Sequence, residues 1–234
     1  MSDGLVRAVV FDLDGLLVDS EPVQIAAWET FLAECGHRLD EGLLGELFGL
    51  RLRDSARLLR DRLGLPLSVE AIVAQRDAHF FAALPGRLHP MPGARELVAA
   101  LRARAVPLAL ATSGHRRYVD LVLAALELAG AFAVAVTGDD VVAGKPAPDI
   151  YLAAATGLGL PPGCCLALED APHGVAAAKV AGLRCLAVPN AMTASLPGLE
   201  RADAILTSLH EVLPWLDERG WLSSAGSRDG RPPG

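Results

Sequence analysis

Hydrophobic and polar positions follow two different patterns in this chain. From residue 90 onward, short apolar runs alternate with segments in which apolar residues recur at every third or fourth position. Short runs bounded by turn residues predict buried strands, and the longer spacing predicts amphipathic helices. Strands that alternate with helices favour an α/β fold built on a doubly wound parallel sheet.

This alternating part can be assigned element by element. Together with a first apolar run at 6–12, the pattern predicts strands at 108–111, 133–137, 165–168, 184–188 and 204–206, and helices at 94–104, 116–128, 148–157, 174–181 and 208–216. The first strand is therefore separated from the second by a long insertion.

The insertion has the second pattern and contains no strand-like run. Helical spacing at 23–35, 53–63 and 68–84 predicts a small helical bundle. We expect a cap domain at 18–89 on a core made of residues 1–17 and 90–220. The remaining segment, 221–234, ends in SSAGSRDGRPPG, which lacks core-forming residues, and we expect it to be a disordered tail.

Composition excludes some classes of partner. Of the 234 residues, 52% are hydrophobic and only 5% are aromatic, and the net charge is −7. An acidic chain with few aromatic residues neither attracts a phosphate backbone nor stacks bases, so we expect no nucleic-acid partner. An anionic ligand would have to be held by local positive charge.

Apolar runs and cysteines bear on the compartment. No run approaches the ~18 to 20 residues of a membrane span, and no charged leader with an apolar core precedes Val6. The four cysteines lack the spacing of zinc ligands and are expected to be reduced thiols. We therefore expect a cytoplasmic protein, without a membrane partner and monomeric.

The first apolar run ends abruptly in two carboxylates, within the sequence VVFDLDGLLVDSEP. Side chains alternate between the two faces of a strand, so Asp12 and Asp14 would point to the same side while Leu13 points into the core. Two like charges beside a buried strand are costly without a partner, although Asp and Gly are also common turn residues. The pair implies a missing cation.

Polar residues follow the later strands too. These are Thr112, Ser113 and Gly114 after the second strand, Lys145 in the loop after the third, and Glu169 with Asp170 after the fourth. Ligands of open α/β sheets bind outside the carboxyl ends of the strands, so we expect these side chains to converge. Mg²⁺ is the natural missing cation, because it prefers carboxylate oxygens together with substrate phosphate.

Each of the later residues also has an ordinary structural interpretation. Thr112 or Ser113 could cap the following helix, and Glu169 and Asp170 could favour the start of theirs. A lysine in a loop is usually a solvated surface charge. Surface cations here are otherwise arginine, however, since the chain has only two lysines, Lys145 and Lys179.

The converging set suits hydrolysis of a phosphate monoester. That reaction needs charge neutralisation, a nucleophile in line with the leaving group and a proton donor. One carboxylate can attack phosphorus to give an aspartyl phosphate, which divides a hard step into two easier ones. The other can protonate the leaving oxygen and later accept a proton from water.

At this point the sequence resembles the haloacid dehalogenase (HAD) superfamily, in the β-phosphoglucomutase-like and sugar-phosphatase branch with a helical cap. The resemblance covers about residues 6–215 and rests on four motifs in order. They are DLDG at 12–15, Thr112, Lys145 in GKPAPD, and Glu169 with Asp170 in LEDAPHGVAAAKVAG.

The resemblance implies a role for each motif residue. Asp12 would be the nucleophile and Asp14 the general acid and base. Mg²⁺ would be bound by Asp12, by the backbone carbonyl of Asp14 and by Asp170, with Glu169 as a ligand or close partner. Lys145 would offset the negative charge of the phosphoryl group.

It also implies the residues that hold the substrate. Thr112 and the N–H of Ser113 would bind the phosphoryl oxygens, beside Gly15 and Gly114. In the cap, Gln24, Arg51 and Arg53 are candidates for contact with a small phosphorylated metabolite. For Arg51 and Arg53 a solvated turn is an equal alternative.

Other reactions of the family fit less well. The dehalogenase branch lacks the second aspartate, and the phosphonate-cleaving branch needs a cap lysine that residues 18–90 do not contain. A sugar phosphomutase would carry His and Arg where this chain has Gln24 and Leu52, although Arg51 or Arg53 could replace that arginine. We therefore predict a Mg²⁺-dependent phosphatase, with a mutase and a non-catalytic phosphate-binding module as alternatives.

Overall fold

The computed structural model describes residues 5–222. Its larger part is a six-stranded sheet in the order β5-β4-β1-β6-β7-β8, in which every pair of neighbours is parallel. The strands are β1 (Ala8–Phe11), β4 (Leu108–Ala111), β5 (Val134–Val136), β6 (Cys165–Glu169), β7 (Arg184–Ala187) and β8 (Ala204–Ile205). The predicted doubly wound α/β fold is confirmed.

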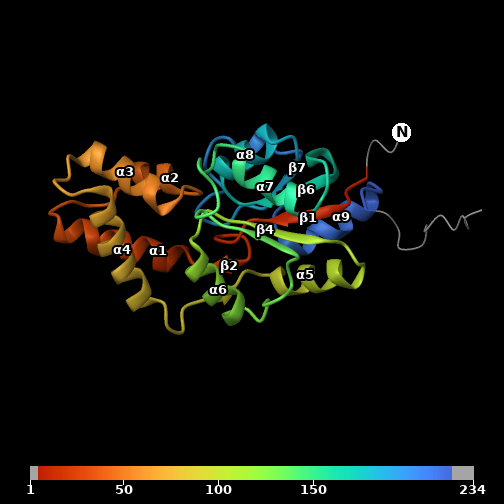
Figure 1. The fold of residues 1–234 in the computed structure, drawn as a ribbon, viewed down its shortest axis with the longest axis horizontal. Coiled ribbons are helices and arrows are strands. Elements are labelled where there is room, and N and C mark those ends of the chain that lie inside the picture. The colour runs from red at the N-terminus through yellow and green to blue at the C-terminus, as the bar shows by residue number, and fades with distance from the viewer. Residues whose placement is uncertain (1–4, 223–234) are drawn as a thin grey trace, which may run out of the picture.

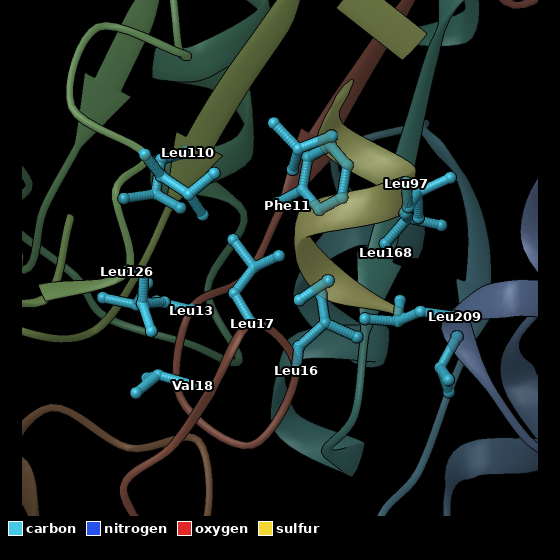
Figure 2. Packing of buried hydrophobic residues seen from close by; sticks show 14 of the residues in the cluster. Phe11, Leu13, Leu16, Leu17, Val18, Leu97, Leu110, Leu126, Leu168 and Leu209 are labelled. Carbon is cyan, nitrogen blue, oxygen red and sulfur yellow. The ribbon is translucent and has the colours of Figure 1, made fainter. Parts of the chain in front are cut away.

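Helices cover both faces of the sheet (Figure 1). One face packs against α5 (Ala94–Ala103), α6 (Arg116–Ala125) and α9 (Val212–Glu218), and the other against α7 (Asp149–Gly157) and α8 (Pro172–Val180). Figure 2 shows the first face, where Phe11, Leu110 and Leu168 of three adjacent strands belong to one apolar cluster with Leu97 of α5. The second face is lined by small residues such as Ala109 and Ala167, which leave room for the helices to approach.

The segment between β1 and α5 contains four helices with an apolar cluster of their own. They are α1 (Glu21–Glu34), α2 (Glu41–Leu47), α3 (Leu52–Leu63) and α4 (Val69–Ala83), called the cap helices below. Trp28, Phe31, Leu59 and Ile72 belong to this cluster. The cap helices lie together at one end of the molecule, beyond the edge of the sheet formed by the strand ends (Figure 1).

Two elements in this segment are absent from the sequence pattern. The short helix α2 has the sequence EGLLGEL, whose two glycines weaken the helical signal, and it begins where the Asp40 side chain accepts a hydrogen bond from the Leu43 N–H. An antiparallel pair of two-residue strands, β2 (Val18–Asp19) and β3 (His89–Pro90), joins the cap helices to the sheet. Strands this short carry no readable alternation.

The last elements differ slightly from expectation. The helix expected at 208–216 is a 3₁₀ turn at Leu209–Glu211 followed by α9. Of the expected tail at 221–234, only Trp221 and Leu222 are among the described residues; the Trp221 ring packs edge-on against Trp215, and Leu222 forms a bridge with Val6. Within residues 5–222, no helix is long and apolar enough to cross a membrane.

Candidate active site

Three adjacent strands of the sheet bring the motif residues together. Because β1 lies between β4 and β6, their carboxyl ends are neighbours, and Asp12, Thr112 and Glu169 stand at those ends. The Asp12 N–H extends the ladder by donating to the Leu168 carbonyl at 3.0 Å. The predicted convergence of residues from distant segments is therefore a feature of the sheet itself.

Lys145 reaches this site from the loop after β5 and is almost fully buried. Its Nζ donates to Asp12 Oδ1 at 2.5 Å and to Glu169 Oε1 at 2.6 Å, and it lies 5.3 Å from the centre of the Tyr151 ring. Only 2% of the residue is exposed. Although burial alone would lower it, the neighbouring carboxylates raise the pKa of Lys145, so the lysine is a fixed positive charge and not a solvated one.

Three buried carboxylates surround that single lysine. Ligand oxygens of Asp12, Glu169 and Asp170 lie within 4.8 Å of one another. Burial, together with the charge of Glu169, raises the pKa of Asp12 to about 7 in spite of Lys145. Burial and the charges of Asp12 and Glu169 raise the pKa of Asp170 well above its usual range. The cluster carries more negative charge than Lys145 offsets.

The donor set fits a hard divalent cation such as Mg²⁺. All three donors are carboxylate oxygens, the ligands Mg²⁺ prefers, and a cation would offset the repulsion that helps to raise the pKa values of Asp12 and Asp170. The Glu169 carboxylate already accepts four hydrogen bonds. Its Oε1 accepts from Lys145 and Tyr151, and its Oε2 accepts from the N–H groups of Asp170 and Ala171. The oxygens of Asp12 and Asp170 accept fewer hydrogen bonds than those of Glu169 and are therefore more available as metal ligands.

Gly15 lets the backbone approach this cluster closely. A Cβ at residue 15 would lie 2.3 Å from Asp170 Oδ2, and the φ angle of +75° is one that side chains other than glycine disfavour. The same Asp170 oxygen accepts a hydrogen bond from Asn190 Nδ2 at 3.1 Å. The turn after β1 is thus held against the acidic cluster.

Asp14 is held separately from Asp12. Its Oδ1 accepts hydrogen bonds from Ser20 Oγ and from Tyr118 Oη, the latter at 2.5 Å. Ser20 is the residue directly before α1, but its side chain makes no capping hydrogen bond to that helix. Neither hydroxyl stands out in the sequence: Ser20 precedes a helix, where serine is common, and Tyr118 lies within a helical apolar pattern.

Thr112, Ser113 and Gly114 form the turn after β4. Thr112 is fully buried and its Oγ1 accepts from the Gly114 N–H at 3.0 Å, while Ser113 Oγ donates to the Gly49 carbonyl at 2.8 Å. The N-cap of the next helix is His115, whose ring accepts from the Tyr118 N–H. Thr112 and Ser113 are therefore not capping residues.

The cap turn at 48–51 contacts two core loops and the start of α8. Besides the bond from Ser113 to Gly49, the Phe48 carbonyl lies 2.8 Å from His173 Nδ1. Arg51 Nη1 donates to the carbonyls of Val141 and Val142 at 3.1 Å, in the loop that leads to Lys145. The Arg51 Nε bonds Asp54, whereas Arg53 makes an exposed ion pair with Glu70.

Gln24 lies beside a buried cation that the sequence pattern conceals. Arg76 of α4 is 3% exposed and donates to Gln24 Oε1, and its guanidinium lies over the rings of Trp28 at 5.3 Å and Phe80 at 4.6 Å. Burial lowers its pKa to about 10, so it stays charged at neutral pH. Among the described residues, the Arg76 Nε is the buried side-chain atom left without a hydrogen-bond partner.

Many of these groups border one cavity between the cap helices and the strand ends. Its volume is about 460 Å³, within the range typical of small-molecule sites. Residues lining it include Asp12, Asp14, Asp170, Ser113, Gly114, Gln24, Arg51, Arg53, Arg76, Trp28, Phe80 and Tyr118. The cavity thus has an acidic floor on the sheet and a roof of cap residues in which apolar side chains such as Trp28 and Phe80 surround the buried cation Arg76, with Arg51 and Arg53 also in the lining.

A family model described as haloacid dehalogenase-like hydrolase matches residues 6–182. The chain belongs to the haloacid dehalogenase-like hydrolases. As a member of this family, it aligns over most of its length with proteins named as phosphatases. The probable pseudouridine-5'-phosphatase of Drosophila melanogaster is 37% identical over 223 residues, which cover 92% of this chain and 96% of the relative.

Solved structures share the fold. CbbY from Rhodobacter sphaeroides, in complex with phosphate, superposes with a TM-score of 0.78 at 31% identity, covering 91% of this chain and 100% of that chain. A β-phosphoglucomutase from Clostridium difficile, with a TM-score of 0.81 over 92% of this chain and 97% of its own, is 20% identical and shows the fold alone. The predicted family and reaction class, hydrolysis of phosphate monoesters, are confirmed.

Proposed function

We propose that this chain is a Mg²⁺-dependent phosphatase that hydrolyses a small phosphorylated metabolite through an aspartyl-phosphate intermediate. The observation that carries the proposal is the position of Asp12, which borders the cavity while its carboxylate is bound by Lys145 and lies beside Asp170. A carboxylate held by a fixed cation at the floor of a cavity is suited to attack on phosphorus.

The surrounding residues would divide the remaining tasks. Asp14 would protonate the leaving oxygen and then accept a proton from the water that hydrolyses the intermediate. Thr112 with the backbone N–H of Ser113 would hold the phosphoryl oxygens, beside Gly15 and Gly114. Lys145 would offset their charge, so that an anionic ester can approach a carboxylate nucleophile.

Mg²⁺ would be held by Asp12, by Asp170 and by the backbone carbonyl of Asp14. When bound, the ion supplies charge neutralisation for the phosphoryl group and for the carboxylates. Because the four acceptor positions of Glu169 are taken by Lys145, Tyr151 and two backbone N–H groups, we propose that Glu169 acts as a partner of Lys145 next to the ion.

We propose that residues 18–89 act as a cap and that the roof of the cavity selects the rest of the substrate. A roof with Trp28 and Phe80 favours the apolar face of a compact organic group, whereas Arg76, with its unpartnered Nε, needs an oxygen acceptor. A sugar phosphate offers both. The phosphatase named for pseudouridine 5'-phosphate, whose substrate contains a phosphorylated ribose, supports this class.

Hydrolysis is favoured over phosphate transfer between positions of a sugar. Gln24 stands where the resemblance places a histidine in the mutases, and its amide oxygen accepts a hydrogen bond from Arg76.

We further propose that the enzyme is cytoplasmic, since the cysteines Cys35, Cys164, Cys165 and Cys185 are all free thiols. That it is a monomer stays a prediction.

The direct test compares wild type with Asp12→Asn on p-nitrophenyl phosphate in the presence of Mg²⁺. We expect wild type to release p-nitrophenol and the variant to be inactive, because the amide cannot form the acyl phosphate. Asp61→Asn, an exposed cap aspartate paired with Arg60, is the matched control and should retain full activity. Equal rates for wild type and Asp12→Asn would refute the proposal.

A second assay separates the phosphatase from the mutase. Phosphorylated sugars, nucleotides and acids are each supplied with and without a bisphosphorylated sugar, and the products are analysed by phosphate release and by NMR. We expect inorganic phosphate from at least one sugar phosphate. An isomerised sugar phosphate formed without phosphate release would identify a mutase.

A further inference from the structure

We propose that Tyr118 is the positioning residue of the general acid, fixing one oxygen of Asp14 so that the other carries the transferred proton. The inference rests on the proposed phosphatase function and adds a residue outside the four motifs. It follows from three observations: the hydrogen bonds to Asp14, the burial of Tyr118 and its packing against the cap.

The hydrogen bonds distinguish the two oxygens of Asp14. Tyr118 Oη donates to Asp14 Oδ1 at 2.5 Å, and Ser20 Oγ donates to the same atom. An oxygen that accepts from two hydroxyl groups is poorly placed to carry a proton of its own. In the acid form of Asp14 the proton therefore belongs on Oδ2.

This arrangement also holds Asp14 in place while the proton is transferred. As the Asp12 carboxylate forms its bond to phosphorus, the ester P–O bond breaks and the leaving oxygen takes the proton from Asp14 Oδ2. The carboxylate that remains keeps both hydrogen bonds on Oδ1. Hydrogen bonds of this kind can persist in both protonation states of Asp14, so Tyr118 keeps the carboxyl group oriented throughout the step.

Tyr118 is well placed to act as a rigid donor. It lies in the first turn of α6, is 2% exposed, and its ring packs edge-on against Phe80 at 5.3 Å. Burial and the charge of Asp14 raise the pKa of Tyr118 well above its usual range, so the phenol keeps its proton. Because Phe80 belongs to α4, packing against a cap helix helps to fix the position of the Tyr118 hydroxyl.

The test uses two esters of similar size that differ in their need for an acid. Phenyl phosphate has a much more basic leaving group than p-nitrophenyl phosphate, so only the former depends strongly on proton donation. In Tyr118→Phe, which keeps the ring, we expect the ratio of kcat/KM for p-nitrophenyl phosphate to kcat/KM for phenyl phosphate to rise about tenfold. Asp14→Asn should raise the same ratio further.

Tyr151→Phe is the matched control, because Tyr151 is another buried tyrosine whose hydroxyl donates to a carboxylate, Glu169, at 2.5 Å. It should lower both values of kcat/KM and leave their ratio as in wild type. Circular dichroism and thermal unfolding establish that each variant is folded. If Tyr118→Phe unfolds, Ser20→Ala, which removes the other donor to Asp14 Oδ1, replaces it in the same ratio measurement.

Two results would overturn the inference. A ratio unchanged in Tyr118→Phe, or lowered, would mean that Tyr118 does not serve proton transfer, even where total activity falls. Wild type that releases phosphate from neither ester in Mg²⁺ would refute the proposed function, and with it the role of Tyr118. The two failures are distinguished by the wild-type assay alone.

Discussion

Lys145 donates a hydrogen bond to Asp12 across 133 positions of the sequence, with Nζ 2.5 Å from Oδ1. Both groups are buried, and the same Nζ also bonds Glu169 at 2.6 Å. One lysine thereby compensates two carboxylates that the strand ends hold in place. Removal of the Lys145 charge would leave buried carboxylates without a partner. The effect should therefore appear in the free energy of unfolding as well as in the activity.

Lys145→Met should lower the free energy of unfolding by about 3–5 kcal/mol at neutral pH, because breaking a buried ion pair strands the remaining charge. The only other lysine provides the control. Lys179 pairs with Asp203 at the surface, each about one third exposed, and Lys179→Met should cost less than about 1 kcal/mol. Urea unfolding of the metal-free proteins measures the loss in the free energy of unfolding for both variants. Equal losses would mean that the buried ion pair of Lys145 stabilises the fold no more than the surface pair of Lys179.

Mg²⁺ should stabilise the folded protein. A cation that binds the acidic cluster in the folded state alone raises the midpoint of thermal unfolding, and EDTA should reverse the effect. Asp170→Asn removes one of the repelling charges, so without metal it should be more stable than wild type, whose Asp170 pKa is raised by burial and by Asp12.

The change in the unfolding midpoint of Asp170→Asn on addition of Mg²⁺ is the decisive measurement. Asp170→Asn should show little change in the unfolding midpoint with Mg²⁺, and it should be inactive. NaCl at the same ionic strength controls for general screening of surface charge. A midpoint that rises equally in wild type and in Asp170→Asn would place the bound ion elsewhere.

Stability of the metal-free protein should fall as the pH rises from about 4.5 to beyond 7, in part through Glu21. Burial, with the charges of Asp14 and Asp19, raises the pKa of Glu21 from 4.5 to about 7, against the opposing hydrogen bond from Asn190. A carboxyl whose pKa is raised on folding stabilises the fold fully below its unfolded pKa. That contribution is lost as the pH rises through the folded value.

Glu21→Gln should therefore flatten the pH dependence, gaining up to about 3 kcal/mol relative to wild type between pH 4.5 and 8. Glu218→Gln, a substitution at an exposed glutamate, is the control and should leave the profile as in wild type. Chemical unfolding at a series of pH values measures the difference. Parallel profiles for wild type and Glu21→Gln would show that Glu21 ionises normally in the folded protein.

The sheet and the candidate site at its carboxyl end could be predicted from the sequence for a physical reason. Strands buried on both faces must be apolar throughout, so polar residues such as Asp12 or Thr112 stand out where a strand stops. Their convergence then follows from the parallel arrangement. Lys145 could be placed for the same reason, although its burial could not.

Tyr118 and Arg76 could not be predicted as site residues from the sequence, because they lie within helices. Tyr118 and Arg76 lie among apolar residues of α6 and α4, where an aromatic ring or a long aliphatic stem is equally consistent with ordinary packing. Their partners, Asp14 and Gln24, are 104 and 52 positions away. Contacts that arise only when the cap helices pack on the sheet leave no local signal.

Arg76 should govern affinity for the organic part of the substrate and not for its phosphate. Its guanidinium is fixed between Gln24 and two aromatic rings in the roof of the cavity, whereas the phosphoryl group is expected at the strand ends. Removing a charged hydrogen-bond donor costs about 1.5–3 kcal/mol. Arg76→Met should therefore lower kcat/KM for the best sugar phosphate about tenfold to a hundredfold.

The inhibition constant of inorganic phosphate separates this role from general damage to the site. Inorganic phosphate has no organic part, so its inhibition of p-nitrophenyl phosphate hydrolysis should be the same in Arg76→Met as in wild type. Arg57→Met, which changes an exposed cap arginine paired with Asp54, should alter neither quantity. If Arg76→Met weakens phosphate and sugar phosphate by the same factor, the arginine supports the whole cavity, and the roof does not select the substrate through it.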